Sequence, residues 1–127
     1  MRVRAVLVVD DDFDIRETLR EVLVEEGYRV DTARDGREAL AYLKSHPPPC
    51  VILLDLMMPG MNGAEFRRAQ RADPALLQIP VVAISASRDL AAFAGELDDV
   101  EHLPKPIQLD VLLDTIARYS QQARALP

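Results

Sequence analysis

The sequence has little cysteine, no excess of basic residues and no long apolar run, and each lack excludes a class of protein. The only cysteine, Cys50, cannot form an intramolecular disulfide, and we expect it to be a buried apolar residue. The net charge of -6 argues against direct binding to nucleic acid or to an anionic membrane surface. Aspartates interrupt the N-terminal apolar stretch too early for a signal peptide or a membrane span. We therefore expect a cytoplasmic protein that binds proteins or small cations.

What the chain does contain is typical of a folded globular domain. Of its 127 residues, 49% are hydrophobic and 28% are charged. This balance is not that of a disordered chain, and the length allows a sizeable core without room for a second domain. We expect residues 1–127 to form one domain.

Short β-branched runs alternate with helical patterns along the whole chain. Strands are predicted at 3–9, 28–33, 51–54, 81–84 and 100–103. Weaker helical patterns cover 36–45, 64–72 and 89–97. Apolar stripes at helical spacing predict the first and last helices, at Ile15, Leu19, Val22 and Leu23, and at Leu109, Leu112, Leu113 and Ile116.

Regular alternation of strand and helix with short connections predicts an α/β fold with a doubly wound, five-stranded parallel sheet. Two of the strands are continuously apolar, as strands covered on both faces tend to be. Sheets of this kind bind ligands beyond the carboxyl ends of their strands. Candidate functional residues should therefore gather at that edge.

Chemically useful side chains follow the ends of four predicted strands. Asp10 and Asp11 follow the first, Asp55 the third, Ser85 the fourth and Lys105 the fifth. Any one of these has an ordinary structural explanation as a turn residue, a helix cap or a solvated surface charge. Together they supply a cation site, a nucleophile, a hydroxyl donor and a fixed positive charge.

These residues lie in segments that resemble the receiver domains of bacterial response regulators. The segments are "VLVVDDD" at 6–12, "VILLDLMMPGMNG" at 51–63, "VVAISAS" at 81–87 and "LPKPI" at 103–107. The resemblance covers nearly the whole chain. It implies the flavodoxin-like (βα)5 fold, with strand order 2-1-3-4-5.

The resemblance also implies a reaction. Asp55 would accept a phosphoryl group from a phosphohistidine of a sensor histidine kinase or a histidine phosphotransfer protein. Asp10, Asp11, Asp55 and the backbone carbonyl of Met57 would hold Mg²⁺, which prefers hard oxygen ligands and retains several waters. The protein would have no separate substrate and would promote its own phosphorylation and dephosphorylation.

The remaining site residues implied by the resemblance come from the last two strands. Lys105 and Ser85 would contact phosphoryl oxygens, and movement of Ser85 would report phosphorylation to the surface. The bond before Pro106 would be cis, which would aim Lys105 into the site.

The sequence departs from the family pattern between Ser85 and Lys105. This stretch is slightly shorter than usual, and His102 occupies a position that is normally Tyr or Phe. An imidazole can fill the space of the aromatic ring that turns inward on activation in this family. The alternative is that His102 simply lies exposed on an edge strand.

Asp12 and Asp14 have a different expected role from Asp10 and Asp11. Both fall at the start of the first predicted helix, where carboxylates gain from unpaired backbone N–H groups and from the helix dipole. We therefore assign them to the helix terminus and not to the metal.

Three other functions are alternatives to phosphoacceptance. The stretch from Asp10 has aspartates at EF-hand spacing, but Ile15 stands where a calcium loop needs glycine, and the preceding residues are strand-like. A haloacid-dehalogenase phosphatase also has Asp-x-Asp after its first strand, but this chain is too short for the usual cap. The third alternative is a degenerate receiver that binds partners without being phosphorylated. The presence of Asp55, Ser85 and Lys105 weighs against it.

Only "SQQARALP" follows the last predicted helix, and this tail cannot hold an output domain. We therefore expect the output to come through an unidentified downstream protein partner. The chain is then either a stand-alone receiver or a receiver cut from a longer protein.

Overall fold

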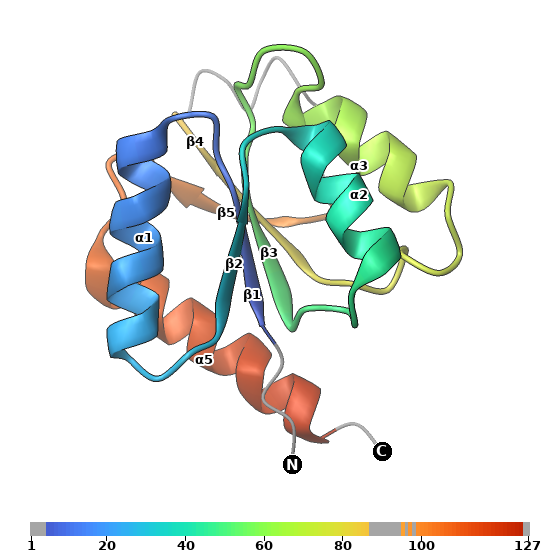
Figure 1. Ribbon diagram of the computed structural model, residues 1–127. Coiled ribbons are helices and arrows are strands. Elements are labelled where there is room, and N and C mark those ends of the chain that lie inside the picture. Colours follow the sequence, from blue (N-terminus) through green and yellow to red (C-terminus); the bar gives the residue numbers. More distant parts are fainter. Residues whose placement is uncertain (1–4, 87–94, 96, 98, 126–127) are drawn as a thin grey trace.

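A five-stranded parallel sheet forms the centre of the protein (Figure 1). The computed structural model describes residues 5–86, 95, 97 and 99–125. The strand order is β2-β1-β3-β4-β5, which confirms the predicted α/β doubly wound fold. The strands are β1 (Val6–Val9), β2 (Val30–Ala33), β3 (Val51–Asp55), β4 (Val81–Ser85) and β5 (Glu101–Pro104). The helices in the described part are α1 (Phe13–Glu25), α2 (Gly36–Ser45), α3 (Gly63–Arg71) and α5 (Leu109–Ala125).

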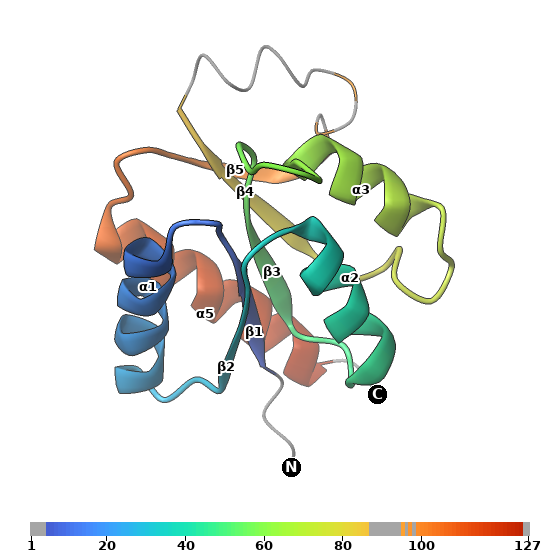
Figure 2. The same ribbon diagram turned by 45° about the horizontal axis from the view of Figure 1, so that its top comes forward.

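Helices cover both faces of the sheet, which explains the continuously apolar strands. Helices α1 and α5 lie on one face, and α2 and α3 lie on the other (Figure 2). Side chains of a strand alternate between the faces. Leu53 therefore packs in the core below α1 and α5, while Ile52 and Leu54 pack in the core below α2 and α3. All three are fully buried.

The observed strands begin and end close to the predicted positions, with physical reasons for the differences. The predicted strand 28–33 begins at Val30, because the Tyr28 N–H donates to the Leu23 carbonyl (3.0 Å) and closes α1. Gly27 makes this turn at φ +96°, which glycine adopts without strain. β3 and β4 each extend one residue further than predicted, so Asp55 and Ser85 are their last residues.

Two other predicted elements are only partly described. The first strand begins at Val6 in the described residues, and positions 3 and 4 of its predicted range lie outside them. Most of the predicted helix 89–97 also lies outside the described residues. Leu97, at its end, is buried in the core below α2 and α3. In the parts of the chain that are described, no helix is long and apolar enough to cross a membrane.

The start of α1 has the cap predicted from the sequence. Asp12 is the N-cap, and its Oδ1 accepts hydrogen bonds from the backbone N–H groups of Asp14 (2.9 Å) and Ile15 (3.2 Å). Asp14 lies in the first turn, where its negative charge complements the helix dipole. The cap fixes the direction of the chain directly after Asp10 and Asp11, which follow β1.

Candidate functional site

Three carboxylates meet at the carboxyl ends of β1 and β3. The two strands are neighbours, and their register places Val9 beside Leu54, so Asp10 and Asp55 follow side by side. Carboxylate oxygens of Asp10, Asp11 and Asp55 lie within 4.8 Å of one another. The structure therefore brings together the three acidic residues that the sequence selected.

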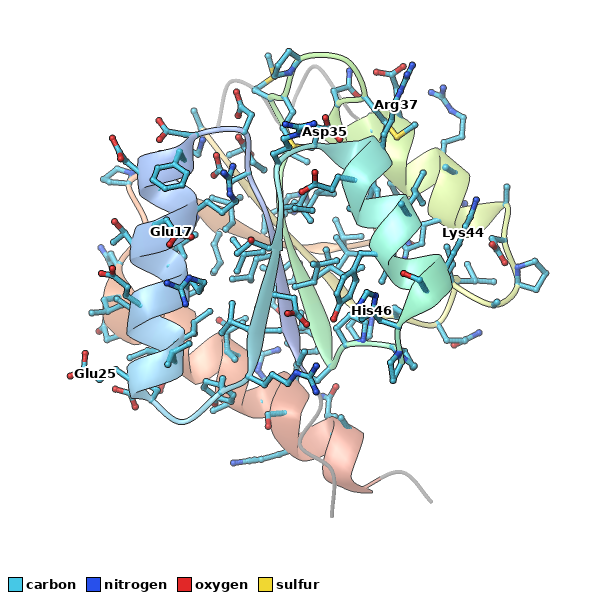
Figure 3. The ribbon with its side chains drawn as sticks, viewed as in Figure 1. Glu17, Glu25, Asp35, Arg37, Lys44 and His46 are labelled. Atoms are coloured by element: carbon cyan, nitrogen blue, oxygen red, sulfur yellow. The ribbon has the colours of Figure 1, made fainter. Side chains whose placement is uncertain are left out.

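Asp10 and Asp55 are buried, unlike most charged residues of this protein. Figure 3 shows Glu25 of α1 and Arg37 and Lys44 of α2 projecting away from the sheet, and all three are exposed. Asp10 and Asp55 are only 3% and 4% exposed. Charges buried this deeply require compensation by an opposite charge or by hydrogen bonds.

Burial makes both carboxylates harder to ionise. It raises the pKa of Asp55 to about 6; the nearby charge of Asp10 adds to this effect, and Lys105 opposes it. The pKa of Asp10 is also raised, chiefly by burial. A cation between these groups would stabilise their ionised forms.

Hydrogen bonds from the protein orient the two buried carboxylates. Asp10 Oδ1 accepts from the Asp12 N–H at 2.8 Å. Asp55 Oδ1 accepts from the Met57 N–H and from Lys105 Nζ, each at 3.3 Å. Among the described residues, both hydrogen bonds to Asp55 thus reach the same oxygen.

β4 and β5 place Ser85 and Lys105 next to Asp55. Ile84 pairs with Asp55 across β3 and β4, so Ser85 lies one residue further along. The Lys105 N–H donates to the Ser85 carbonyl (3.1 Å), which extends the β4–β5 ladder beyond Pro104. The Lys105–Pro106 bond is cis, as the resemblance implied.

The Ser85 hydroxyl has an unusual environment. The residue is 1% exposed, and Oγ has no hydrogen-bond partner among the residues that the structure describes. A buried hydroxyl without a partner loses its hydration without compensation. Its position beside Asp55 is that of a donor for a further ligand at the carboxyl edge.

The acidic residues have the chemistry of a Mg²⁺ site. Mg²⁺ is bound in proteins by one or a few carboxylates together with waters and phosphoryl oxygens, not by a closed cage. Asp10 and Asp55 are buried, whereas Asp11 is exposed, so the group is open on one side. The three carboxylates fit the ion, and the Met57 carbonyl as a fourth protein ligand stays a prediction.

His102 lies on β5, three residues before Lys105. Its partner in the β4–β5 register is Ala83, whose side chain is in the core below α2 and α3. Leu103 packs in the opposite core. His102 is half-buried, and its Nε2 is buried with no hydrogen-bond partner in the described part of the chain. β5 is an edge strand, as this alternative expected, but His102 is half-buried and not fully exposed on it. A role in switching stays a prediction.

Comparison with known families identifies the family of the chain. The sequence of residues 6–117 matches the response regulator receiver domain family. The chain belongs to this family. The match includes Asp10, Asp11, Asp55, Ser85 and Lys105.

Relatives and solved structures agree with this assignment. The receiver domain is 44% identical over 110 residues to response regulator MprA of Mycolicibacterium vanbaalenii, covering 85% of this chain but 46% of that protein. It is 30% identical to sporulation initiation phosphotransferase F of Bacillus subtilis, covering 90% and 91% of the two chains. The structure of chemotaxis protein CheY4 of Vibrio cholerae superposes with a TM-score of 0.81 at 33% identity, covering 93% of this chain and 99% of that one. The chain thus spans about half the length of the MprA relatives.

The receiver domain has one site contact that the sequence analysis missed. Arg16, in the first half of α1, donates from Nη1 to the backbone carbonyl of Asp10 at 2.8 Å. Its position four residues after the N-cap Asp12 was the available indication, because one helical turn returns a long side chain to the helix start.

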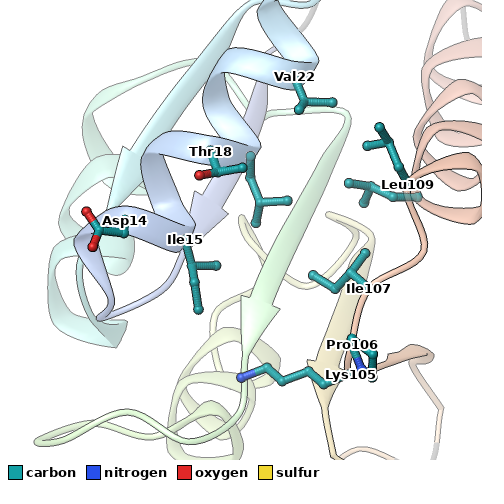
Figure 4. A pocket seen from close by; sticks show the side chains of 10 residues that line it. Asp14, Ile15, Thr18, Val22, Lys105, Pro106, Ile107 and Leu109 are labelled. Carbon is teal, nitrogen blue, oxygen red and sulfur yellow. The ribbon is translucent and has the colours of Figure 1, made fainter.

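An apolar groove of about 520 Å³ adjoins the site between α1 and the start of α5. Figure 4 shows Ile15 and Val22 of α1 facing Ile107 and Leu109 across it, with Lys105 extending toward the end of β3. Ile15 and Leu109 are 38% and 50% exposed. The rim of the receiver site is therefore apolar on this side.

Proposed function

We propose that this receiver domain accepts a phosphoryl group on Asp55 from a phosphohistidine of a sensor histidine kinase or a histidine phosphotransfer protein. The observation that carries the proposal is the contact of Asp55 with Lys105 Nζ (3.3 Å) inside a cluster of three carboxylates. A buried carboxylate with a raised pKa beside a fixed cation is a typical arrangement for a reactive group. The relative from Bacillus subtilis is a sporulation initiation phosphotransferase, which supports the same reaction class.

The reaction is a displacement at phosphorus. The ionised Asp55 attacks through Oδ2, because Oδ1 already accepts from the Met57 N–H and Lys105 Nζ. A new P–O bond forms while the P–N bond of the phosphohistidine breaks, and the released imidazole nitrogen keeps the electron pair and takes up a proton. Such a transition state needs positioning and charge neutralisation more than further covalent chemistry.

The proposed cofactor is Mg²⁺, held by Asp10, Asp11, Asp55 and the Met57 carbonyl. When bound, the ion neutralises the negative charge of the phosphoryl oxygens and of the carboxylates. Lys105 Nζ, 3.3 Å from Asp55 Oδ1, supplies a second positive charge. Asp10 and Asp11 would hold the ion next to Asp55, since their carboxylate oxygens lie within 4.8 Å of those of Asp55.

Ser85 and His102 are the proposed switch. The Ser85 hydroxyl, which has no partner among the described residues, donates to a phosphoryl oxygen once Asp55 is modified. His102 lies on the neighbouring strand β5, next to Ala83, and its ring follows the displacement of the Ser85 segment. The altered face then binds a downstream protein. Unchanged NMR signals of the His102 ring on addition of beryllofluoride would refute this role.

A degenerate receiver that acts without phosphorylation is the second candidate from the sequence. The gathering of Asp55, Ser85 and Lys105 at one edge supports phosphoacceptance instead. We place the reaction in the cytoplasm, which agrees with the single, buried Cys50.

The test uses phosphoramidate, a small donor that carries the same P–N bond as phosphohistidine. With Mg²⁺ present, intact mass should show the gain of one phosphoryl group, and none with the ion chelated or in Asp55→Asn. Asp12→Asn is the matched control, because Asp12 is an acidic neighbour engaged in capping α1. Phosphorylation of Asp55→Asn, or none of the wild type, would overturn the assignment.

A further inference from the structure

Arg16 is the only side chain among the described residues that hydrogen-bonds the backbone of an acidic site residue from another element. Its guanidinium points at the Asp10 carbonyl, although three carboxylates lie close by. A guanidinium next to acidic residues would ordinarily form ion pairs with them. Because Arg16 contacts the carbonyl, it does not occupy the carboxylate oxygens that a metal ion would need.

Asp10 is held by three hydrogen bonds that act on different atoms. Its N–H donates to the Ala33 carbonyl of β2 at 3.1 Å. Its Oδ1 accepts from the Asp12 N–H at 2.8 Å, and its carbonyl accepts from Arg16 at 2.8 Å. Asp10 lies beyond the last residue of β1, so the strand ladder alone does not fix its carbonyl. Arg16 supplies the contact that does.

The Arg16 side chain is itself fixed in place. Its guanidinium carbon lies 5.4 Å from the centroid of the Phe13 ring, a distance typical of a cation–π contact. Its backbone N–H donates to the Asp12 carbonyl (2.9 Å) in the first turn of α1. The residue is half-buried, which limits the alternative positions of the side chain.

We propose that Arg16 is a positioning residue for the metal site, holding the Asp10 carboxylate where it can bind Mg²⁺. This inference rests on the proposed function, because it assumes that the acidic cluster binds the ion. Groups that orient metal ligands commonly contribute about tenfold or more to metal affinity. The positive charge of Arg16 acts in the opposite sense, because it repels a divalent cation. The sign of the effect of removing Arg16 therefore separates the two roles.

The experiment measures Mg²⁺ affinity by isothermal titration calorimetry for the wild type, Arg16→Met, Arg16→Lys and Arg20→Met. Arg20 is the matched control, because it lies one turn further along α1, pairs with Glu17 (3.1 Å) and loses the same charge on substitution. We expect Arg16→Met to weaken binding about tenfold. Arg16→Lys should restore part of the affinity by donating one hydrogen bond to the carbonyl, and Arg20→Met should remain within about twofold of the wild type.

A second readout needs no metal. The amide proton of Asp12 donates to Asp10 Oδ1, so its NMR shift in the metal-free protein reports the position of that carboxylate. The shift should change in Arg16→Met and not in Arg20→Met. Phe13→Ala provides an independent variant, because Phe13 is 64% exposed and its removal frees the guanidinium without opening the core. Phe13→Ala should weaken Mg²⁺ binding, as Arg16→Met does.

The outcomes distinguish this inference from the function on which it rests. If the wild type does not bind Mg²⁺, both the proposed metal site and the role of Arg16 are wrong. If the wild type binds Mg²⁺ and Arg16→Met binds it more tightly, Arg16 acts only as a repelling charge; if Arg16→Met binds it equally, Arg16 has no influence on the metal site. The positioning role is then refuted while the proposed function stands.

Discussion

Among the described residues, charged side chains are buried in two regions, and their surroundings shift carboxylate pKa values in opposite directions. At the carboxyl edge of the sheet, Asp10 and Asp55 are buried and the pKa of each is raised, first because of burial. Between α3 and β5, Arg67 is buried and donates to Gln70 Oε1 and Asp99 Oδ2, both at 2.8 Å. Burial also opposes the ionisation of Asp99, but the hydrogen bond and charge of Arg67 outweigh it and lower its pKa.

The two regions differ in how far their buried polar groups have partners, and this difference distinguishes a binding site from a structural contact. Gln70 completes the second region by donating to the carbonyls of Leu76 (3.0 Å) and Ile79 (2.9 Å), so that most of its buried polar atoms have partners. Arg67 Nε is the exception among the described residues. At the carboxyl edge, the Ser85 hydroxyl has no such partner, and three carboxylates face one lysine. Buried polar groups left unsatisfied there are available to a ligand.

The largest effect that would test this comparison is expected from Arg67→Met. The change removes the cation of a buried contact, so the free energy of unfolding should fall by about 2–3 kcal/mol, less than for a fully buried pair because the Asp99 side chain is 57% exposed. Urea denaturation monitored by circular dichroism measures it. Arg71→Met, a charge loss at an exposed position of the same helix, should change stability by less than about 0.5 kcal/mol. Equal losses in the two variants would contradict the comparison.

Asp55→Asn should change the free energy of unfolding in the opposite direction to Arg67→Met. The folded pKa of Asp55 is about 6, against an ordinary value of 3.8, so its ionised form opposes folding above pH 6. Without Mg²⁺, the substitution should raise the free energy of unfolding by about 1–3 kcal/mol at pH 7.5. The gain should shrink as the pH falls through 6 and vanish below about 3, where the wild-type carboxyl is protonated in both the folded and the unfolded state. Stability curves of both proteins across this range measure it, and a gain independent of pH would show that burial of the charge is not its cause.

The smallest effect concerns two buried hydroxyls. Ser85 has no partner among the described residues, whereas Thr115 Oγ1 donates to the Val111 carbonyl at 2.8 Å. Ser85→Ala should leave stability unchanged or raise it by up to about 1 kcal/mol, while Thr115→Val should lower it by about 0.5–1 kcal/mol. Urea denaturation of the two variants shows whether the stability of each rises or falls. Ser85→Ala should also slow phosphorylation by phosphoramidate, which Thr115→Val should not; equal behaviour of the two variants would argue that Ser85 is an ordinary core residue.

The sequence predicted the fold and the acidic site for clear physical reasons. Continuous apolar runs such as 51–54 indicate strands covered on both faces, and the carboxyl ends of parallel strands meet at one edge. Asp10, Asp11 and Asp55 could therefore be placed together before their contacts were known.

Contacts that depend on side-chain direction could not be predicted in the same way. The position of Arg16 one turn after the N-cap Asp12 allows a contact with the start of the helix, but periodicity does not show that Arg16 contacts the Asp10 carbonyl while Arg20 pairs with Glu17. The predicted strand 28–33 is longer than the edge strand β2, which begins at Val30. The hydrogen bond of Tyr28 to the end of α1 competes with strand pairing there. Such choices between local partners depend on packing in three dimensions and not on periodicity.

The contact of Lys105 with Asp55 spans 50 residues of chain, from the last residue of β3 to the residue directly after β5. Contacts between such distant positions form only after the intervening chain has closed into a loop, which carries an entropic cost. A chain still emerging from the ribosome can form β1 and β3, but it has no Lys105 beside the acidic residues until β5 has docked against β4. The complete set of site residues is therefore assembled only in molecules whose sheet has folded. A chain that is still being synthesised has no complete site.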